Sequence, residues 1–136
     1  MFDHEKLDVY RLSLKFTSWA YLLCKNLKGS ERFIRDQMLR ASQSIPQNIA
    51  EGNGKRSGPD RRRFFEIARG SAFECASILD ILLVCGIHSE NEVSSGKELL
   101  FRIAAMLSKM TTVTNQTREE NQSYFFNNIE HNEIGE

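Results

Sequence analysis

The sequence predicts an all-α protein, an up-down-up-down bundle of four helices, from three observations. Apolar residues recur at steps of three and four through most of the chain, which is the period of an amphipathic helix. Only two prolines and eight glycines interrupt the 136 residues, too few for the many turns of an all-β sandwich. Short breaks divide the pattern into four stretches, as expected for antiparallel helices joined by short loops.

A first helix is expected over residues 4–28, with an unusually wide apolar face. Two adjacent stripes make up this face: Leu7, Tyr10, Leu14 and Tyr21 form one, and Leu12, Phe16, Trp19, Leu23 and Leu27 form the other. So wide a face packs on two neighbouring helices and exceeds what a small isolated bundle has to bury. We therefore predict a contact between subunits through its aromatic residues, namely Tyr10, Phe16, Trp19 and Tyr21.

A second helix is expected over residues 31–51, although a proline within it disfavours a regular helix. Pro46 lies inside the apolar pattern, where it removes one backbone donor and crowds the carbonyl of Ser42. We expect a kink or a break at this point. Asn48, two residues further on, is placed to satisfy backbone groups that the proline leaves free.

Third and fourth helices are expected over residues 58–85 and 90–113. The third follows a glycine-containing loop and opens on a capping box, in which Ser57 can cap the helix and Asp60 can reach back to its amide. The fourth opens on a second sequence of this kind and keeps an apolar seam at helical spacing. No stretch between these helices alternates as a strand would.

Charge and polarity divide the chain into a body and a tail. Residues 1–114 hold the four helices, whereas residues 115–136 are dense in Asn, Gln and Glu and are expected to form a mostly disordered tail. The formal net charge is zero, but residues 1–70 carry 14 Lys+Arg against 8 Asp+Glu, and residues 71–136 carry 4 against 10. Because residues 111–136 contribute −4, the chain is a mildly basic body with an acidic tail.

The sequence favours a cytoplasmic protein without enzymatic activity. No apolar run approaches the ~20 residues that span a bilayer, and the charged N-terminus lacks the apolar segment of a signal peptide. The three histidines form no HxxxH or ExxH pair, and no nucleotide-binding or hydrolase motif occurs. The three cysteines show no CxxC spacing and are expected to be buried, reduced thiols. We therefore predict no catalytic residue, no metal and no cofactor.

A group of basic residues is the strongest candidate for a functional site. Five of them lie within nine positions, at the tip that joins the second and third helices, and two more lie along the second helix. Arginine forks suit bidentate contact with phosphate, so binding of a nucleic-acid backbone is one interpretation. The other is a solvated loop whose arginines pair with nearby carboxylates or contact a neighbouring subunit. The candidates are Lys55, Arg56, Arg61, Arg62, Arg63, Arg35 and Arg40.

Two stretches resemble a known family. SIPQNIAEG, followed by GKRSGPDRRRFFEIARGSAFE, is similar to the signature of the four-helix-bundle proteins encoded in intervening sequences of bacterial 23S rRNA genes. The same family includes the accessory protein of diversity-generating retroelements. The resemblance spans about residues 5–113, and its signature positions indicate fold and assembly more than a site. In this chain they are Ser44, Pro46, Asn48, Glu51, Gly52, Arg56 and Ser57.

The resemblance implies a homopentamer of four-helix bundles without known enzymatic activity. For the retroelement relative it also implies a basic surface that binds nucleic acid and a reverse transcriptase. This chain departs from that relative in its neutral overall charge and its acidic tail. Five copies of residues 1–110, each with net charge +4, would still gather roughly twenty positive charges on one particle. We therefore predict an oligomeric protein that binds RNA or DNA; the alternative is an oligomeric scaffold for protein partners that binds no nucleic acid.

Overall fold

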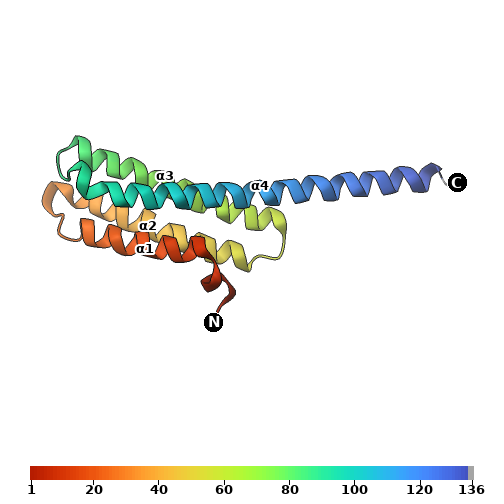
Figure 1. Cartoon of the computed structure of the whole chain (residues 1–136), viewed down its shortest axis with the longest axis horizontal. Helices are drawn as coiled ribbons and strands as arrows, with labels where there is room; N and C mark the ends of the chain where they lie inside the picture. The colour runs from red at the N-terminus through yellow and green to blue at the C-terminus, as the bar shows by residue number, and fades with distance from the viewer. Residues whose placement is uncertain (135–136) are drawn as a thin grey trace.

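The computed structural model describes the backbone of residues 1–134 and the side chains of residues 1–112. Its elements follow the order η1 (Asp3–Lys6), α1 (Asp8–Cys24), η2 (Gly29–Glu31), α2 (Arg32–Gly54), α3 (Gly58–Val84) and α4 (Glu90–Ile134). No strand occurs in residues 1–134. The four long helices lie side by side and alternate in direction (Figure 1), so the all-α prediction is confirmed.

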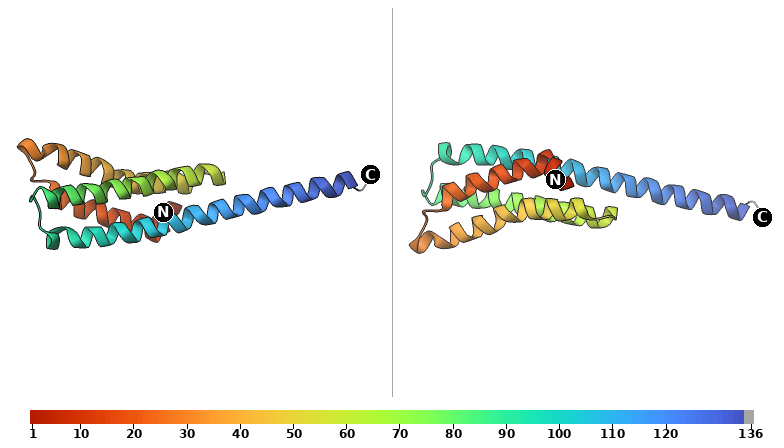
Figure 2. Two further views of the ribbon diagram at one scale, coloured as in Figure 1. Left: turned by 90° about the horizontal axis from the view of Figure 1, so that it is seen from above. Right: turned by 90° about the horizontal axis from the view of Figure 1, so that it is seen from below.

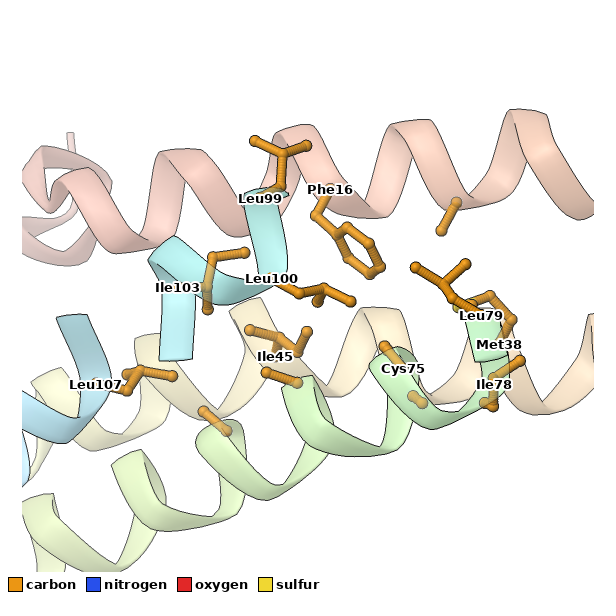
Figure 3. Close-up of a cluster of buried hydrophobic side chains, with 14 of the residues drawn as sticks. Phe16, Met38, Ile45, Cys75, Ile78, Leu79, Leu99, Leu100, Ile103 and Leu107 are labelled. Atoms are coloured by element: carbon orange, nitrogen blue, oxygen red, sulfur yellow. The ribbon is translucent and has the colours of Figure 1, made fainter. Parts of the chain in front are cut away.

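Each long helix packs on two others, in the cyclic order α1, α2, α3, α4 and back to α1. Within the described part of the chain, the two diagonal pairs of long helices lie further apart than neighbouring pairs and approach each other through side chains in the core. The apolar stripes of all four helices meet along the axis, where Phe16, Met38, Ile45, Leu79 and Ile103 are completely buried. Figure 3 shows these side chains converging on one core. This order leaves four sides on the bundle, each formed by two neighbouring helices.

The fourth helix differs most from its predicted length. We expected it to end near residue 113, but α4 continues through Ile134 and extends past the end of the bundle (Figure 1). Neither glycine nor proline occurs between Lys97 and Ile134, so no backbone feature stops the helix. The tail that we expected to be mostly disordered is therefore helical over residues 115–134, and residues 135–136 lie outside the described residues.

Helices α1 and α4 approach closely where Trp19 lies over Gly96. A Cβ atom on Gly96 would lie 2.1 Å from Cη2 and Cζ3 of the indole, so only glycine leaves room for the ring. The indole also lies beside Phe16, with 5.6 Å between the ring centroids. Both aromatic residues therefore contribute to packing within one chain.

This packing changes the prediction of an aromatic contact between subunits. Phe16 is completely buried in the core of its own chain and is not available to a neighbour. Trp19 and Tyr10 are partly buried against the same core, whereas Tyr21 is 53% exposed. The apolar face of α1 is wide because it packs on both α2 and α4, and Tyr21 is the predicted contact residue that remains at the surface.

We expect Gly96→Ala to lower the free energy of unfolding by about 1–3 kcal/mol, because the added methyl group displaces the Trp19 ring from its site. Gly70→Ala is the matched control, since a Cβ there meets nothing within 4 Å. That change should raise stability by about 0.5–1 kcal/mol through helix propensity alone. Urea denaturation followed by circular dichroism measures both. Equal stability of the two variants would contradict the close approach.

Candidate nucleic-acid interface

The predicted basic residues cluster where α2 turns into α3. Gly52 in the last turn of α2 is buried, and a Cβ there would lie 2.9 Å from Cε1 of Phe65 in α3. This glycine lets the two helices come together just before the loop. Ser57 then caps α3, because its Oγ accepts a hydrogen bond of 3.2 Å from the backbone N–H of Asp60. The loop is thereby held at the end of a tightly packed helix pair.

The side chain of Arg61 caps the C-terminal end of α2. Its Nη1 donates a hydrogen bond of 2.8 Å to the carbonyl of Asn53 and lies 3.4 Å from the carbonyl of Lys55. The last carbonyls of a helix have no N–H partner within the helix, so this guanidinium satisfies groups that would otherwise need water. The carbon Cζ of Arg61 also lies 5.6 Å from the ring centroid of Phe65. Arg61 is therefore a helix-capping residue, and its contact with nucleic acid stays a prediction.

Three basic residues remain exposed at this end, and we call Lys55, Arg56 and Arg63 the basic tip. Lys55 Nζ lies 5.1 Å from the ring centroid of Phe64, and Arg63 Cζ lies 4.8 Å from the same centroid. Among the described residues, no carboxylate forms an ion pair with any of the three. The aromatic ring thus holds two cations at the surface with their charge uncompensated. Arg62, the remaining tip candidate, is half-buried and already engaged in the chain.

Arg35 and Arg40 do not belong to this group. Arg35 lies near the start of α2, about 30 Å along the helix from the tip. Its Nη1 donates a 3.0 Å hydrogen bond to the carbonyl of Leu27, and its Nε lies 3.0 Å from Oδ1 of Asp36. Arg40 forms a 2.8 Å ion pair with Glu74 of α3. Both arginines therefore have partners within the chain, and the structure does not bring them to the tip.

A second cationic surface lies between α1 and α4, and sequence reasoning missed it. Arg11 and Lys15 of α1 and Arg102 of α4 line adjoining grooves on this side, and Lys15 and Arg102 line both. Asp8 and Glu98 also line these grooves, but no ion pair joins a carboxylate of residues 1–112 to these three cations. We call Arg11, Lys15 and Arg102 the α1–α4 cationic face. The spacing of Arg11 and Lys15 signals one helix face, whereas Arg102 joins them only through the tertiary fold.

The signature proline lies inside a continuous helix. α2 runs through Pro46 without a break, although it changes direction along its length (Figure 2). Pro46 has no N–H to donate to the carbonyl of Ser42. Instead Thr17 of α1 lies with Oγ1 3.0 Å from that carbonyl and 2.9 Å from the carbonyl of Ser13. A neighbouring helix thus supplies the donor that the proline removes.

Asn48 has a different partner from the one we expected. Its Nδ2 donates a 2.7 Å hydrogen bond to the carbonyl of Ser44 and lies 3.0 Å from the hydroxyl of the same residue. That hydroxyl is 2.8 Å from Oγ of Ser71 in α3. Ser44, which Asn48 contacts, therefore connects α2 to α3, while Thr17 connects α1 to the Ser42 carbonyl of α2. Ser44 and Asn48 thus have contacts within the chain, and a role of the signature in assembly stays a prediction.

The cysteines do not share one environment. Cys24 and Cys75 are buried, and burial raises the pKa of their thiols to about 11 and about 12. Cys85, which we expected to be buried, is exposed at the end of α3. Among the described residues, no three His, Cys, Asp or Glu side chains are grouped to hold a metal ion. These residues also contain no helix with the length and apolarity needed to cross a bilayer.

Comparison with known proteins identifies a family and similar solved structures. The family model described as 23S rRNA-intervening sequence protein matches residues 5–109. The chain is also similar to a crystal structure, at 1.70 Å resolution, of a protein with unknown function from the S23 ribosomal protein family of Bacteroides thetaiotaomicron. The TM-score is 0.71 at 25% sequence identity, and the match covers 76% of this chain and 97% of the other. No protein with a curated description matches.

Thr17→Val should lower the free energy of unfolding by about 1–3 kcal/mol, because it leaves the Ser42 carbonyl without a donor. In a Pro46→Ala background the restored N–H can bind that carbonyl. Thr17→Val should then lower the free energy of unfolding by clearly less. A double-mutant cycle by urea denaturation measures this coupling. Thr112→Val is the control, since that exposed hydroxyl bonds only within α4 among the described residues. Identical costs of Thr17→Val in both backgrounds would contradict the assignment.

A thiol reagent should label one of the three cysteines rapidly in the native protein, and all three after denaturation. The raised pKa and the burial of Cys24 and Cys75 keep both thiols protonated and out of contact with the reagent. Cys85→Ser should remove the rapid phase. Rapid labelling of two thiols in the native wild-type protein would show that the core opens.

Proposed function

Because the chain belongs to the family of 23S rRNA-intervening sequence proteins, we propose that it is a non-enzymatic, oligomeric protein that binds nucleic acid through the phosphate backbone. The observation that carries the proposal is the basic tip, where Lys55, Arg56 and Arg63 are exposed without a carboxylate partner in residues 1–112. The α1–α4 cationic face supports it as a second surface of the same kind. The proposal assigns the protein no cofactor and a cytoplasmic location.

The chemistry of both surfaces suits phosphate rather than a particular base. Guanidinium groups form paired hydrogen bonds with phosphate oxygens, and an ammonium group adds a compact charge. The one aromatic ring of the tip, Phe64, is already covered by Lys55 and Arg63, so it offers little face for stacking of a base. We therefore propose binding to RNA or DNA without sequence preference. The affinity falls steeply as the salt concentration rises, because release of counterions from the nucleic acid then contributes less to binding.

Assembly of several copies would strengthen the electrostatic attraction between the cationic surfaces and a nucleic acid. Five copies would multiply both cationic surfaces and raise the local positive potential around one particle. We propose a homopentamer on the basis of the family resemblance. We also propose that a reverse transcriptase becomes a partner where the gene lies beside one in a retroelement.

A second candidate function is an oligomeric scaffold that contacts other proteins and no nucleic acid. The observation that favours it is the internal use of Arg35, Arg40 and Arg61. Their bonds to Leu27, Glu74 and Asn53 leave fewer of the predicted cations facing solvent. The two functions differ in one measurable property, which is salt-dependent affinity for a polyanion.

Fluorescence anisotropy with a labelled single-stranded RNA, at about 50 mM and about 200 mM salt, tests the proposal. Wild type should bind, and more weakly at the higher concentration. Arg56→Gln with Arg63→Gln should weaken binding and flatten the slope of log affinity against log salt by about 0.7 for each lost phosphate contact. Lys15→Gln with Arg102→Gln reports in the same way on the α1–α4 cationic face.

Lys25→Gln with Lys28→Gln is the matched control, because it removes two exposed positive charges at the opposite end of the bundle. This variant should bind RNA as wild type does. If the tip variant and the control lose RNA affinity equally, the loss reflects net charge alone and the basic tip is not a binding site. An absence of binding by wild type at the lower salt concentration would overturn the proposal and leave the scaffold function.

A further inference from the structure

The α1–α4 side of the bundle carries two grooves that share a pair of cations. The first groove has a volume of about 310 Å³ and the second about 250 Å³. Both volumes are near the lower end of the roughly 300–1,000 Å³ that small-molecule sites occupy, so each groove has room for one small ring system. The first groove is lined by Asp8, Arg11, Leu12, Lys15, Arg102 and Met106, and the second by Lys15, Trp19, Ser95, Glu98, Leu99 and Arg102.

Both grooves offer apolar surface that belongs to the packed bundle. Leu12 and Met106 in the first groove are partly buried and pack against the core. In the second groove Leu99 belongs to the core itself, and the indole of Trp19 is held by its fit over Gly96. A flat ring that enters either groove therefore meets a preformed apolar surface, which includes an aromatic side chain in the second groove.

The charges on this side follow a simple order. Lys15 and Arg102 line both grooves and therefore lie where the two meet. A single carboxylate lines each groove beyond them, Asp8 in the first and Glu98 in the second. Within residues 1–112, neither carboxylate forms an ion pair with these cations. The side thus presents two cations in the middle and one hydrogen-bond acceptor in each flanking groove.

We propose that this side binds one nucleotide step of a single strand: the phosphate lies between Lys15 and Arg102, and the two bases beside it enter the two grooves. The inference rests on the proposed binding of nucleic acid and names the form that the α1–α4 cationic face selects. The ammonium and guanidinium groups match the phosphate charge. The carboxylates accept hydrogen bonds from the N–H groups on base edges.

The spacing of the grooves excludes stacked bases. Leu12 and Trp19, one from each groove, are seven residues apart on α1, which is about 10 Å along the helix axis. Consecutive bases in a duplex strand are only about 3.4 Å apart. The two bases must therefore be splayed, which an unpaired strand permits.

Base pairing excludes a duplex for a second reason. Each base carries at least one N–H on its Watson–Crick edge, and in a duplex these groups are already bound to the opposite strand. Only unpaired bases can donate to Asp8 and Glu98. Because all four bases have such a donor, the grooves select strandedness without selecting sequence, in agreement with the proposed function.

An acidic protein segment is the other ligand that two cations would attract. Its side chains carry like charge along their length, so they would meet the carboxylates of Asp8 and Glu98 on either side of the cations. A nucleotide step places its negative charge in the middle and neutral rings at both ends. The order of charges on this side therefore favours the nucleotide step.

Anisotropy with one RNA sequence, as a single strand and as a duplex, tests the inference at about 50 mM salt. By charge alone the duplex should bind more tightly, because it carries twice as many phosphates per unit length. We expect the single strand to bind more tightly. Trp19 is the only tryptophan of the chain, so its fluorescence reports on the second groove. Single-stranded RNA should quench this fluorescence, whereas duplex RNA and inorganic polyphosphate should not.

Ser95→Leu fills the second groove without changing the charge, since Ser95 is exposed and lines it. It should remove the quenching and lower the affinity for single-stranded RNA roughly tenfold, the loss of one base contact. Ser94→Leu is the matched control, because this neighbouring exposed serine lines neither groove. It should bind and quench as wild type does. Thermal unfolding verifies that both variants are folded, and Ser95→Gln replaces Ser95→Leu if the latter is not.

The outcomes separate this inference from the proposed function. If the duplex binds as tightly as the single strand, or if the single strand leaves the fluorescence of Trp19 unchanged, the inference is overturned while nucleic-acid binding stands. Quenching by polyglutamate and not by RNA would assign the grooves to an acidic protein and would also overturn it. If wild type binds neither form of RNA, both the inference and the proposed function fail.

Discussion

The structure depends on two places where a glycine lets an aromatic ring enter between helices. Trp19 lies on Gly96 between α1 and α4, and Phe65 lies against Gly52 between α2 and α3. These contacts draw the helices together on two opposite sides of the bundle. Grooves lie on the α1–α2 and α3–α4 sides, and two more lie on the α1–α4 side. The two glycines therefore determine how closely α1 packs on α4 and α2 packs on α3.

Helical periodicity was enough to predict four helices and, to within a residue, the start of α2, α3 and α4, because burial of an amphipathic stripe dominates their formation. The first helix was expected from residue 4, whereas α1 begins at Asp8, after a short 3₁₀ turn. It did not predict how the chain tolerates Pro46, since the compensating hydroxyl of Thr17 lies 25 residues from the Ser42 carbonyl that it satisfies. Nor did it predict the end of α4. Polar composition favoured a disordered tail, yet the absence of glycine and proline after Gly96 lets the helix continue to Ile134.

Local charge density could locate the basic cluster but could not sort its members. Arg61 and Arg63 are two residues apart, and Arg61 binds the carbonyl of Asn53 while Arg63 lies over Phe64 at the surface. Residues two apart on a helix project about 200° apart around its axis, and the packing of α3 on α2 decides which of the two faces the end of α2. The same reasoning applies to Arg102, whose place beside Lys15 depends on the pairing of α1 with α4. Whether a basic side chain is free to contact a ligand therefore depends on how the helices pack, and not on its position in the sequence alone.

The acidic end of the chain limits how a polyanion can approach. α4 extends beyond the bundle at the end where the basic tip lies (Figure 1), and residues 111–136 carry a net charge of −4. Residues 120–134 alone span about 20 Å of helix, so much of this charge lies further from the tip than the Debye length of about 10 Å at 0.1 M salt. Screening therefore separates the two regions at moderate salt.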